Sequence, residues 1–181
     1  PGPWAVGQDP VRLNPSYFLP FAFRSFAAVD PERDWMALVE GSYGLLEALM
    51  PLGTLPPDWV HLDPETAART DDPSGAPEHS ADHGYEAFRV AWTLAADARW
   101  HDEPRARALL ATYADLGARY AREGRLAAIV DVHGAPLTPY DSPGFYGSLL
   151  AAWGEARPSD AAALFEREIA PLSGIGGRGG W

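Results

Sequence analysis

The stretch that decides the fold is "HGYEAFRVAWTL", residues 83–94. Its apolar residues recur at helical spacing and continue downstream, so we expect a helix from about Gly84 to Trp100. On such a helix Glu86 and Arg89 are three residues apart and share a face. The neighbouring face carries three aromatic residues: Tyr85, Phe88 and Trp92.

Two interpretations of the Glu86 and Arg89 pair stay open from the residues alone. The simpler one is a solvent-exposed ion pair, which stabilises a helix by roughly 0.2–0.5 kcal/mol. The functional one is a carboxylate kept ionised by the helix N-terminus and by the neighbouring guanidinium. Such a group is suited to accept a proton near neutral pH, and it is poorly suited to act as a general acid.

Working outward, the apolar periodicity predicts five more helices. The first covers about 15–28, with Pro20 in its first turns, where proline is tolerated best. The second opens with Asp30 as N-cap and Pro31 at the first helical position. The helix after the opening stretch covers 102–124 and stops at Gly124. Two shorter helices follow, over residues 142–155 and 158–172.

The remaining segments connect these helices. Residues 51–82 are rich in proline, aspartate and turn residues, so we expect a long irregular connection with a short strand at 58–62. Residues 127–137 are expected to form a short hairpin or an extended segment. Antiparallel helix pairs with little strand signal predict an all-α fold.

Composition narrows the possible functions. The 181 residues are enough for one domain, and 25 acidic against 14 basic residues give a net charge of −11, which disfavours nucleic acid as a partner. The chain has no cysteine and no lysine, which excludes disulfides, thiolate zinc sites, Schiff-base chemistry and a Walker lysine. No apolar run approaches the roughly 18 residues of a membrane-spanning helix, so no membrane insertion is expected. The opening "PGPWAVGQDP" lacks methionine, and we interpret it as a processed or truncated start.

Histidines near the opening stretch allow one metal hypothesis. His79 and His83 are four residues apart, with Glu78 directly before the first and Asp82 directly before the second, which would form a metal site if the segment were helical. The alternative is that Ser80 or Asp82 caps the following helix. The order of residues differs from HExxH, and we predict no metal site.

Aromatic residues are common outside the expected helix interiors. They make up 12% of the chain, with 7 tryptophans. Each alone is most simply explained by core packing. As a set, flat aromatic faces mixed with carboxylates and arginine suit a carbohydrate site, because sugar rings stack on aromatic faces while hydroxyls bond to charged groups. The residues concerned are Trp4, Tyr17, Trp59, Tyr85, Tyr140 and Phe145.

Four segments, taken in order, resemble the C-terminal half of glycoside hydrolase family 8. They are "LNPSYFLPFAFRSFA", "LPPDWV", "GYEAFRVAWTLAAD" and "SPGFYGSLLAAW", and the resemblance runs from about Leu13 to Trp153. The most specific pieces are residues 14–17, 57–60 and 85–89.

This resemblance implies an (α/α)6 toroid, of which the chain supplies about three helix pairs, with residues 1–181 forming the C-terminal half of a single catalytic domain. It implies an inverting endo-β-1,4-glucanase that acts on β-1,4-glucan or cello-oligosaccharides and needs no metal or organic cofactor. It also implies a secreted or periplasmic location. The family's general acid belongs to the N-terminal half, which the same gene or a second chain would supply, so this chain alone is expected to be incomplete.

The family's motif transfers roles to individual residues. Glu86 stands where the family has the aspartate base, Arg89 would hold its carboxylate, and Tyr17 would position the water or the distorted sugar. Substrate-binding roles are implied for Tyr85, Trp59 and Asn14, with Trp4 as a weaker candidate.

Two alternative functions remain. A glutamate in place of the aspartate is compatible with a non-catalytic glucan-binding protein of the same fold. An unrelated helical-toroid enzyme, such as a polysaccharide lyase or an epimerase, is the other.

Overall fold

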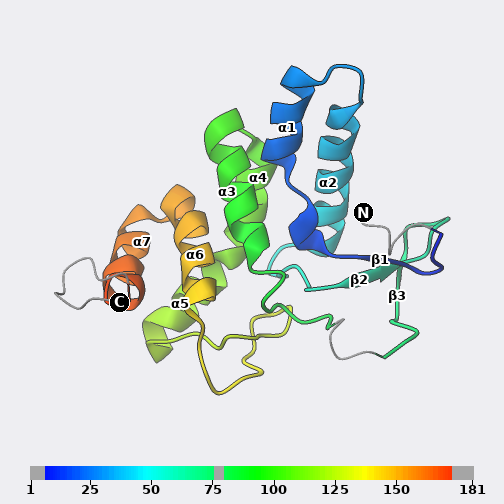
Figure 1. Ribbon diagram of the computed structural model, residues 1–181. Helices are drawn as coiled ribbons and strands as arrows, with labels where there is room; N and C mark the ends of the chain where they lie inside the picture. The colour runs from blue at the N-terminus through cyan, green and yellow to red at the C-terminus, as the bar shows by residue number, and fades with distance from the viewer. Residues whose placement is uncertain (1–6, 76–79, 173–181) are drawn as a thin grey trace.

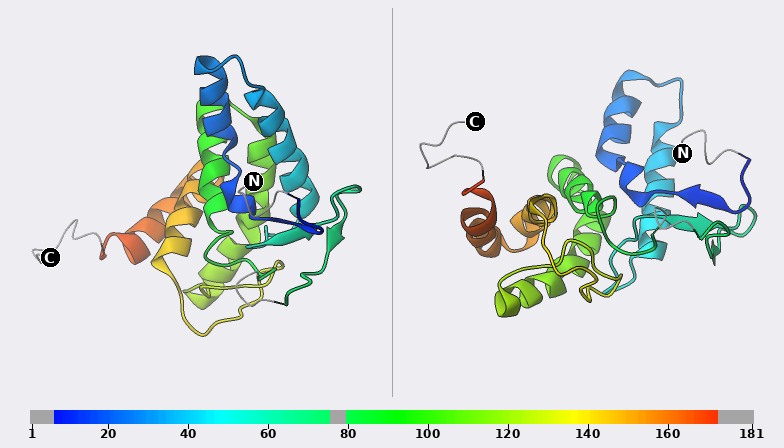
Figure 2. Two further views of the ribbon diagram at one scale, coloured as in Figure 1. Left: turned by 45° about the vertical axis from the view of Figure 1, so that its right-hand side comes forward. Right: turned by 60° about the horizontal axis from the view of Figure 1, so that its bottom comes forward.

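Helices form most of the molecule, whose computed structural model describes residues 7–75 and 80–172. Within these ranges six of the seven α-helices stand in three pairs, α1 with α2, α3 with α4, and α6 with α7, and α3 packs between α1 and α6 (Figures 1 and 2). None of the helices there is long and apolar enough to cross a membrane. The α-helices are α1 (Pro20–Val29), α2 (Trp35–Leu49), α3 (Arg89–His101), α4 (Pro104–Leu110), α5 (Ala114–Glu123), α6 (Pro143–Ala156) and α7 (Pro158–Leu164).

The core lies between these pairs. Its fully buried large side chains come mainly from α2, α3, α6 and the turn before α5, including Tyr43, Leu46, Leu94, Tyr113 and Leu149. Burying such side chains stabilises the fold by roughly 1.5–3 kcal/mol each relative to exposure. The core therefore fixes α3, and with it the residues at the start of that helix.

A small antiparallel sheet lies beside the helices, with strand order β1-β2-β3. Strand β2 (Val60–Leu62) confirms the expected strand, whereas β1 (Val11–Leu13) and β3 (Arg69–Thr70) were not predicted. Two- and three-residue strands carry too little alternation to be recognised in a sequence. The pairing of β1 with β2 matters for the site, because it brings the segment after Leu13 next to the segment before Val60.

The predicted helix over 15–28 is wrong as a single element. The structure has a 3-10 helix, η2 (Pro15–Tyr17), and then a separate α1 that begins at Pro20. The backbone of Leu19 is non-helical, as expected for a residue that precedes proline. Asn14 caps η2, since its side chain accepts a hydrogen bond from the backbone N–H of Ser16.

The predicted start of the second helix is also wrong. Asp34, not Asp30, is the N-cap of α2, and its side chain accepts from the backbone N–H of Ala37 at 3.0 Å. Asp30 ends α1 instead and pairs with Arg33 at 2.5 Å. Both aspartates precede helical patterns, but the turn between the two antiparallel helices occupies residues 31–34.

The opening stretch forms a turn and then a helix, so the predicted start at Gly84 is wrong. Helix α3 begins at Arg89, and residues 85–88 form a turn that carries Glu86. The C-terminal end, at His101, is one residue from the predicted one. Asp102 follows with a φ of 54°, a left-handed conformation that ends the helix.

Two later predicted helices each correspond to more than one element of the structure. The helix expected over 102–124 consists of α4, a 3-10 turn η4 (Ala111–Tyr113) and α5, although its predicted stop at Gly124 is confirmed by a φ of 71°. The helix expected over 158–172 consists of α7 and a π-helical turn, η5 (Phe165–Ile169). The prediction for 142–155 agrees with α6, and an antiparallel bridge between Val130 and Pro136 confirms a hairpin-like segment.

Candidate active site

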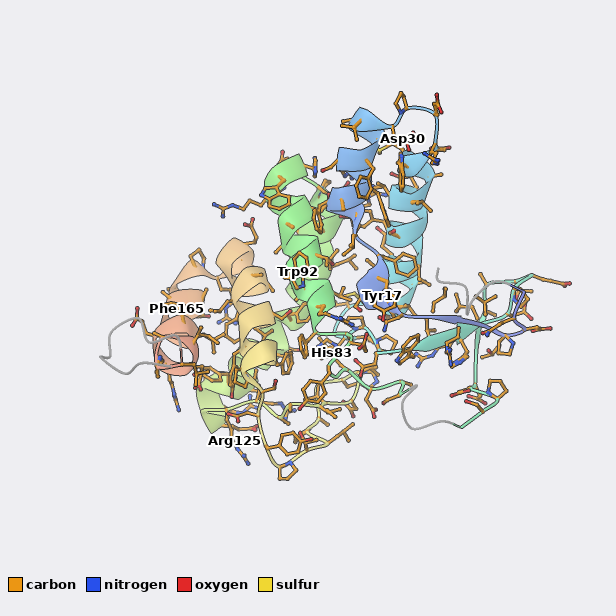
Figure 3. All side chains as sticks on the ribbon, in the orientation of Figure 1. Tyr17, Asp30, His83, Trp92, Arg125 and Phe165 are labelled. Atoms are coloured by element: carbon orange, nitrogen blue, oxygen red, sulfur yellow. The ribbon has the colours of Figure 1, made fainter. Side chains whose placement is uncertain are left out.

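Segments that are far apart in the sequence meet at the N-terminal end of α3. Figure 3 shows Tyr17 and His83 at this end of the helices, with Trp92 farther along α3. The 3-10 helix η2 supplies Tyr17, the segment before β2 supplies Trp59, and the turn before α3 supplies Glu86. The pairing of β1 with β2 explains why the first two segments are neighbours.

The carboxylate of Glu86 is held on one side. Its Oε2 accepts a hydrogen bond from Asn14 Nδ2 at 2.7 Å and another from Arg89 Nη2. Among residues 7–75 and 80–172, no donor bonds to its Oε1. The side chain is 32% exposed, so this second oxygen is available to water.

Arg89 connects the carboxylate to two aromatic rings. Its Nε also donates to the backbone oxygen of Glu86 at 3.3 Å, which fixes the guanidinium from a second direction. The guanidinium carbon lies 5.7 Å from the centre of the Tyr17 ring, within cation–π range. Tyr17 in turn meets Trp59 edge to face at 6.4 Å, and Arg12 lies 5.3 Å from the Trp59 ring.

Asn14 lies behind the carboxylate and is only 3% exposed. Its Nδ2 donates to Glu86, and its Oδ1 accepts from Ser16 N at 3.0 Å and from Ser16 Oγ at 2.6 Å. Both ends of the amide are therefore bonded within the protein. The structure brings Asn14 to the predicted site, in a place where it orients Glu86.

The other predicted binding residues differ in position. Tyr85 is 48% exposed, meets Phe88 edge to face at 6.1 Å, and lies near the Tyr140 side chain. Desolvation, followed by the contact with Tyr140, raises the pKa of the Tyr85 hydroxyl. Tyr85 thus adjoins Glu86 in sequence and extends the aromatic surface through Tyr140. Trp4 lies outside the described residues.

Sequence reasoning missed Asp58, which caps the turn that carries Glu86. Its Oδ1 accepts hydrogen bonds from the backbone N–H groups of Gly84, Glu86 and Ala87. The predicted caps were Ser80 and Asp82, but these two bond to each other instead. Because Asp58 is 26 to 29 residues away along the chain, no local spacing pointed to it. The only available signal was its place in the block at 57–60, one of the most specific pieces of the family resemblance.

The structure gives no support to the metal hypothesis where it can be examined. His83 is fully buried, and its Nδ1 bonds to the backbone oxygen of Pro56 at 2.8 Å. Burial lowers the pKa of His83 to about 4, so the ring is neutral at pH 7. In the described part of the chain, no three histidine or acidic side chains are grouped to hold an ion. His79 and Glu78 lie outside that part.

This arrangement suits proton transfer from a water molecule. One carboxylate oxygen is fixed by two donors, and the other faces solvent, where it can accept a proton from water. Two exposed aromatic residues belong to the same region: Tyr17, whose ring lies by Arg89, and Tyr85, which directly precedes Glu86.

The sequence and the fold match known proteins. The profile of glycosyl hydrolases family 8 matches residues 1–155. Endoglucanase A of Acetivibrio thermocellus is 30% identical over 145 residues, which cover 77% of this chain and 28% of that protein.

Solved structures give the same result. The endo-1,4-D-glucanase from Vibrio fischeri ES114 has a TM-score of 0.75 at 23% identity, over 96% of this chain and 48% of that one. A xylobiose complex from Teredinibacter turnerae, described as GH8, has a TM-score of 0.67 at 23% identity, over 86% and 39%. The chain thus spans about a quarter of the curated relative and half or less of these solved ones.

These likenesses confirm the expected all-α fold with the helix pairs of an (α/α)6 toroid. A family profile that covers residues 1–155 accounts for the ordered motifs, for the helix pairs and for the grouping of Asn14, Tyr17, Glu86 and Arg89. The chain belongs to glycosyl hydrolases family 8.

Proposed function

We propose that this chain is the C-terminal half of an inverting endo-β-1,4-glucanase domain and that Glu86 is its general base. The general acid would lie in the other half of the same toroid. The observation that carries the proposal is the geometry of Glu86, whose Oε2 is held by Asn14 and Arg89 while no described residue bonds to Oε1.

The proposed reaction uses that free oxygen. Glu86 removes a proton from a water whose oxygen bonds to the anomeric carbon, as the bond from that carbon to the leaving sugar oxygen breaks. The general acid donates its proton to the leaving oxygen, and the configuration at the anomeric carbon inverts. Inverting enzymes keep their two carboxyl groups about 6.5–9.5 Å apart, so the acid is expected opposite Glu86 across the bound sugar.

The aromatic residues support an oligosaccharide substrate. Tyr17 is 47% exposed and Tyr85 is 48% exposed, so both offer accessible aromatic surface in the segments around Glu86. Sugar rings stack on such faces, and the adjacent polar groups bond to the hydroxyls. The relatives named as glucanases, and the one described as a xylobiose complex, agree with a β-linked glycan as substrate.

The glutamate in place of the family's aspartate is compatible with this role. Its extra methylene extends the carboxylate by about 1.5 Å, a shift large enough to affect catalysis. Here the longer side chain reaches both Asn14 and Arg89. We therefore expect Glu86→Asp to lower kcat, because the shorter side chain would lose at least one of these two bonds.

Hydrolysis by the full-length gene product is the direct test. We expect release of reducing ends from cellopentaose and, by NMR, the α-anomer as the first product. Glu86→Gln is expected to lower kcat by roughly 10²–10⁴-fold, the usual contribution of a general base. The Glu86→Gln variant should still bind cellopentaose, as measured by calorimetry.

Glu40→Gln is the matched control, because Glu40 is also a carboxylate paired with an arginine, Arg105, but lies on α2. Its kcat should equal that of the wild type. A β-anomer as first product, or full activity of Glu86→Gln, would refute the proposed role of Glu86.

One observation favours a second candidate function. The change from the family's aspartate to Glu86 is also what a glucan-binding protein without hydrolytic activity would tolerate. Binding of cello-oligosaccharides by the full-length protein without any product would favour this alternative. A secreted or periplasmic location remains a prediction, which fractionation of the source cells would test.

A further inference from the structure

The turn that carries Glu86 depends on a distant carboxylate. The first backbone N–H groups of a helix have no partner within the helix itself. The turn that leads into α3 likewise leaves backbone N–H groups to be satisfied, and three of them point to Asp58 Oδ1, at 2.9 Å from Gly84 N, 3.1 Å from Glu86 N and 2.7 Å from Ala87 N. One oxygen therefore fixes the backbone of Glu86 and of the residue that follows it.

Asp58 is itself held in place. Its backbone N–H donates to Asp82 O at 2.7 Å, and the next N–H, of Trp59, donates to Ser80 O at 3.0 Å. A Cβ added to Gly84 would lie 2.7 Å from Asp58 Oδ2, closer than real Cβ contacts. The carboxylate thus fits against this turn only because residue 84 is a glycine.

The position of Asp58 also relates the two sides of the site. The residue that follows it is Trp59, whose ring meets Tyr17, and the turn that it caps carries Glu86. Burial raises the pKa of Asp58, the three backbone donors oppose that shift, and the nearby Glu86 carboxylate adds to it. Asp58 thus occupies this place beside Glu86 although burial and the like charge of Glu86 both work against a second carboxylate there.

We propose that Asp58 is a positioning residue for the base, holding the turn at 84–87 so that Glu86 keeps one oxygen on Asn14 and Arg89 and presents the other to water. This inference rests on the proposed function of Glu86. It assigns to Asp58 no contact with the substrate.

The test compares Asp58→Ala and Asp58→Asn in the full-length gene product. Asp58→Ala removes the acceptor, so kcat on cellopentaose should fall by roughly 10–100-fold, as for a misplacement of about 1 Å, while KM changes by less than about 3-fold. Asn keeps an acceptor oxygen in the same place, so Asp58→Asn should recover most of the lost kcat.

Asp63→Ala is the matched control. Asp63 Oδ1 also accepts from two backbone N–H groups, of Glu65 at 3.0 Å and Thr66 at 2.7 Å, but on the exposed connection between β2 and β3. This variant loses the same kind of turn and should keep the wild-type kcat.

A second pair of variants tests the contact with Gly84. Gly84→Ala should lower kcat like Asp58→Ala, because the new methyl group displaces the carboxylate. The double variant Gly84→Ala/Asp58→Ala should be no worse than either single variant, since the clash is gone. Independent structural damage would instead add up.

The outcomes separate the two proposals. A wild-type protein without hydrolysis overturns the proposed function and this inference with it. If hydrolysis needs Glu86 but Asp58→Ala keeps the wild-type kcat, only the role of Asp58 is overturned. The same holds if Asp58→Ala loses activity only because its KM rises. If Asp58→Ala fails to fold, Asp58→Asn and Gly84→Ala decide: nearly full kcat in Asp58→Asn together with a lowered kcat at unchanged KM in Gly84→Ala supports the inference, and a wild-type kcat in Gly84→Ala refutes it.

Discussion

Two carboxylate–arginine clusters lie along α3, and they differ in how completely their oxygens are used. Asp97 is fully buried, with Oδ1 bonded to Arg24 Nε at 3.1 Å and Oδ2 to the Tyr43 hydroxyl at 2.5 Å. Glu86 is 32% exposed, and its two partners in the described part of the chain, Asn14 and Arg89, both bond to the same oxygen, Oε2. The first carboxylate is saturated, whereas the second keeps one oxygen free of bonds from the described residues.

The Asp97 cluster continues into a network that joins four helices. Arg24, on α1, also bonds to Glu103, the N-cap of α4, and Glu103 bonds to Arg105 at 2.9 Å. Arg105 reaches Glu40 on α2 at 2.7 Å. Burial beside Asp97 raises the pKa of the Tyr43 hydroxyl far above its usual range, so Tyr43 remains a donor.

The comparison shows that the same pair of chemical groups serves two purposes. A buried carboxylate whose oxygens are all bonded has nothing left to offer a substrate, and its removal leaves charges without partners. A half-exposed carboxylate with a free oxygen adds little stability and keeps its capacity to accept a proton.

The largest expected effect follows from removing the saturated carboxylate. Asp97→Ala leaves Arg24 and the Tyr43 hydroxyl without their buried partner, so the free energy of unfolding should fall by about 3–5 kcal/mol. Urea unfolding measured by tryptophan fluorescence checks this value. Glu86→Ala is the paired variant and should lower the free energy of unfolding by about 1 kcal/mol or less. Equal losses at the two positions would remove the distinction between the clusters.

His83 extends the comparison to an uncharged group directly before the Glu86 turn. Its folded pKa is about 4 because of burial, against 6.5 for the exposed imidazole. As the pH falls below 6.5, His83 becomes protonated in the unfolded chain, whereas in the folded chain it stays neutral until about pH 4. Stability is therefore complete above pH 6.5 and should decrease by about 3 kcal/mol by pH 4.

Urea unfolding at intervals between pH 4 and pH 7 measures this slope. His83→Gln should flatten it, even if the variant is less stable at every pH. His101→Gln, at the exposed end of α3, should leave the slope as in the wild type. An unchanged slope in His83→Gln would mean that other groups set the acid sensitivity.

Local features of the sequence predicted local features of the structure. The apolar periodicity gave α6 almost to the residue, Gly124 marked a helix end, and the spacing of Glu86 and Arg89 predicted their contact. That contact survives the later start of α3 because the turn before it already brings Arg89 N to Glu86 O at 3.3 Å.

The contacts that define the candidate site were beyond such reasoning. Asn14 and Glu86 are 72 residues apart, and only the folded chain joins them. The pairing of two three-residue strands, β1 and β2, brings the segment that carries Asn14 next to the segment that carries Asp58, and strands this short leave no pattern. The family resemblance assigned Asn14 and Tyr17 to the site, whereas Asp58 emerged from the backbone donors that it satisfies.

The smallest expected effect concerns the arginine of the unsaturated cluster. Arg89 donates through Nη2 to the carboxylate and through Nε to the backbone of Glu86, and its flat guanidinium lies over Tyr17. A lysine keeps the charge, but its one ammonium nitrogen cannot occupy the positions of both Nε and Nη2, and it has no flat face to lie over Tyr17. Arg89→Lys should therefore lower kcat about 10-fold, with a smaller change in KM, in steady-state kinetics on cellopentaose. Arg99→Lys, an exposed pair with Glu155 at the other end of α3, should retain the wild-type kcat. If Arg89→Lys also retained it, charge alone would suffice to hold Glu86, and the fixed orientation of its Oε2 would no longer explain the difference between the two clusters.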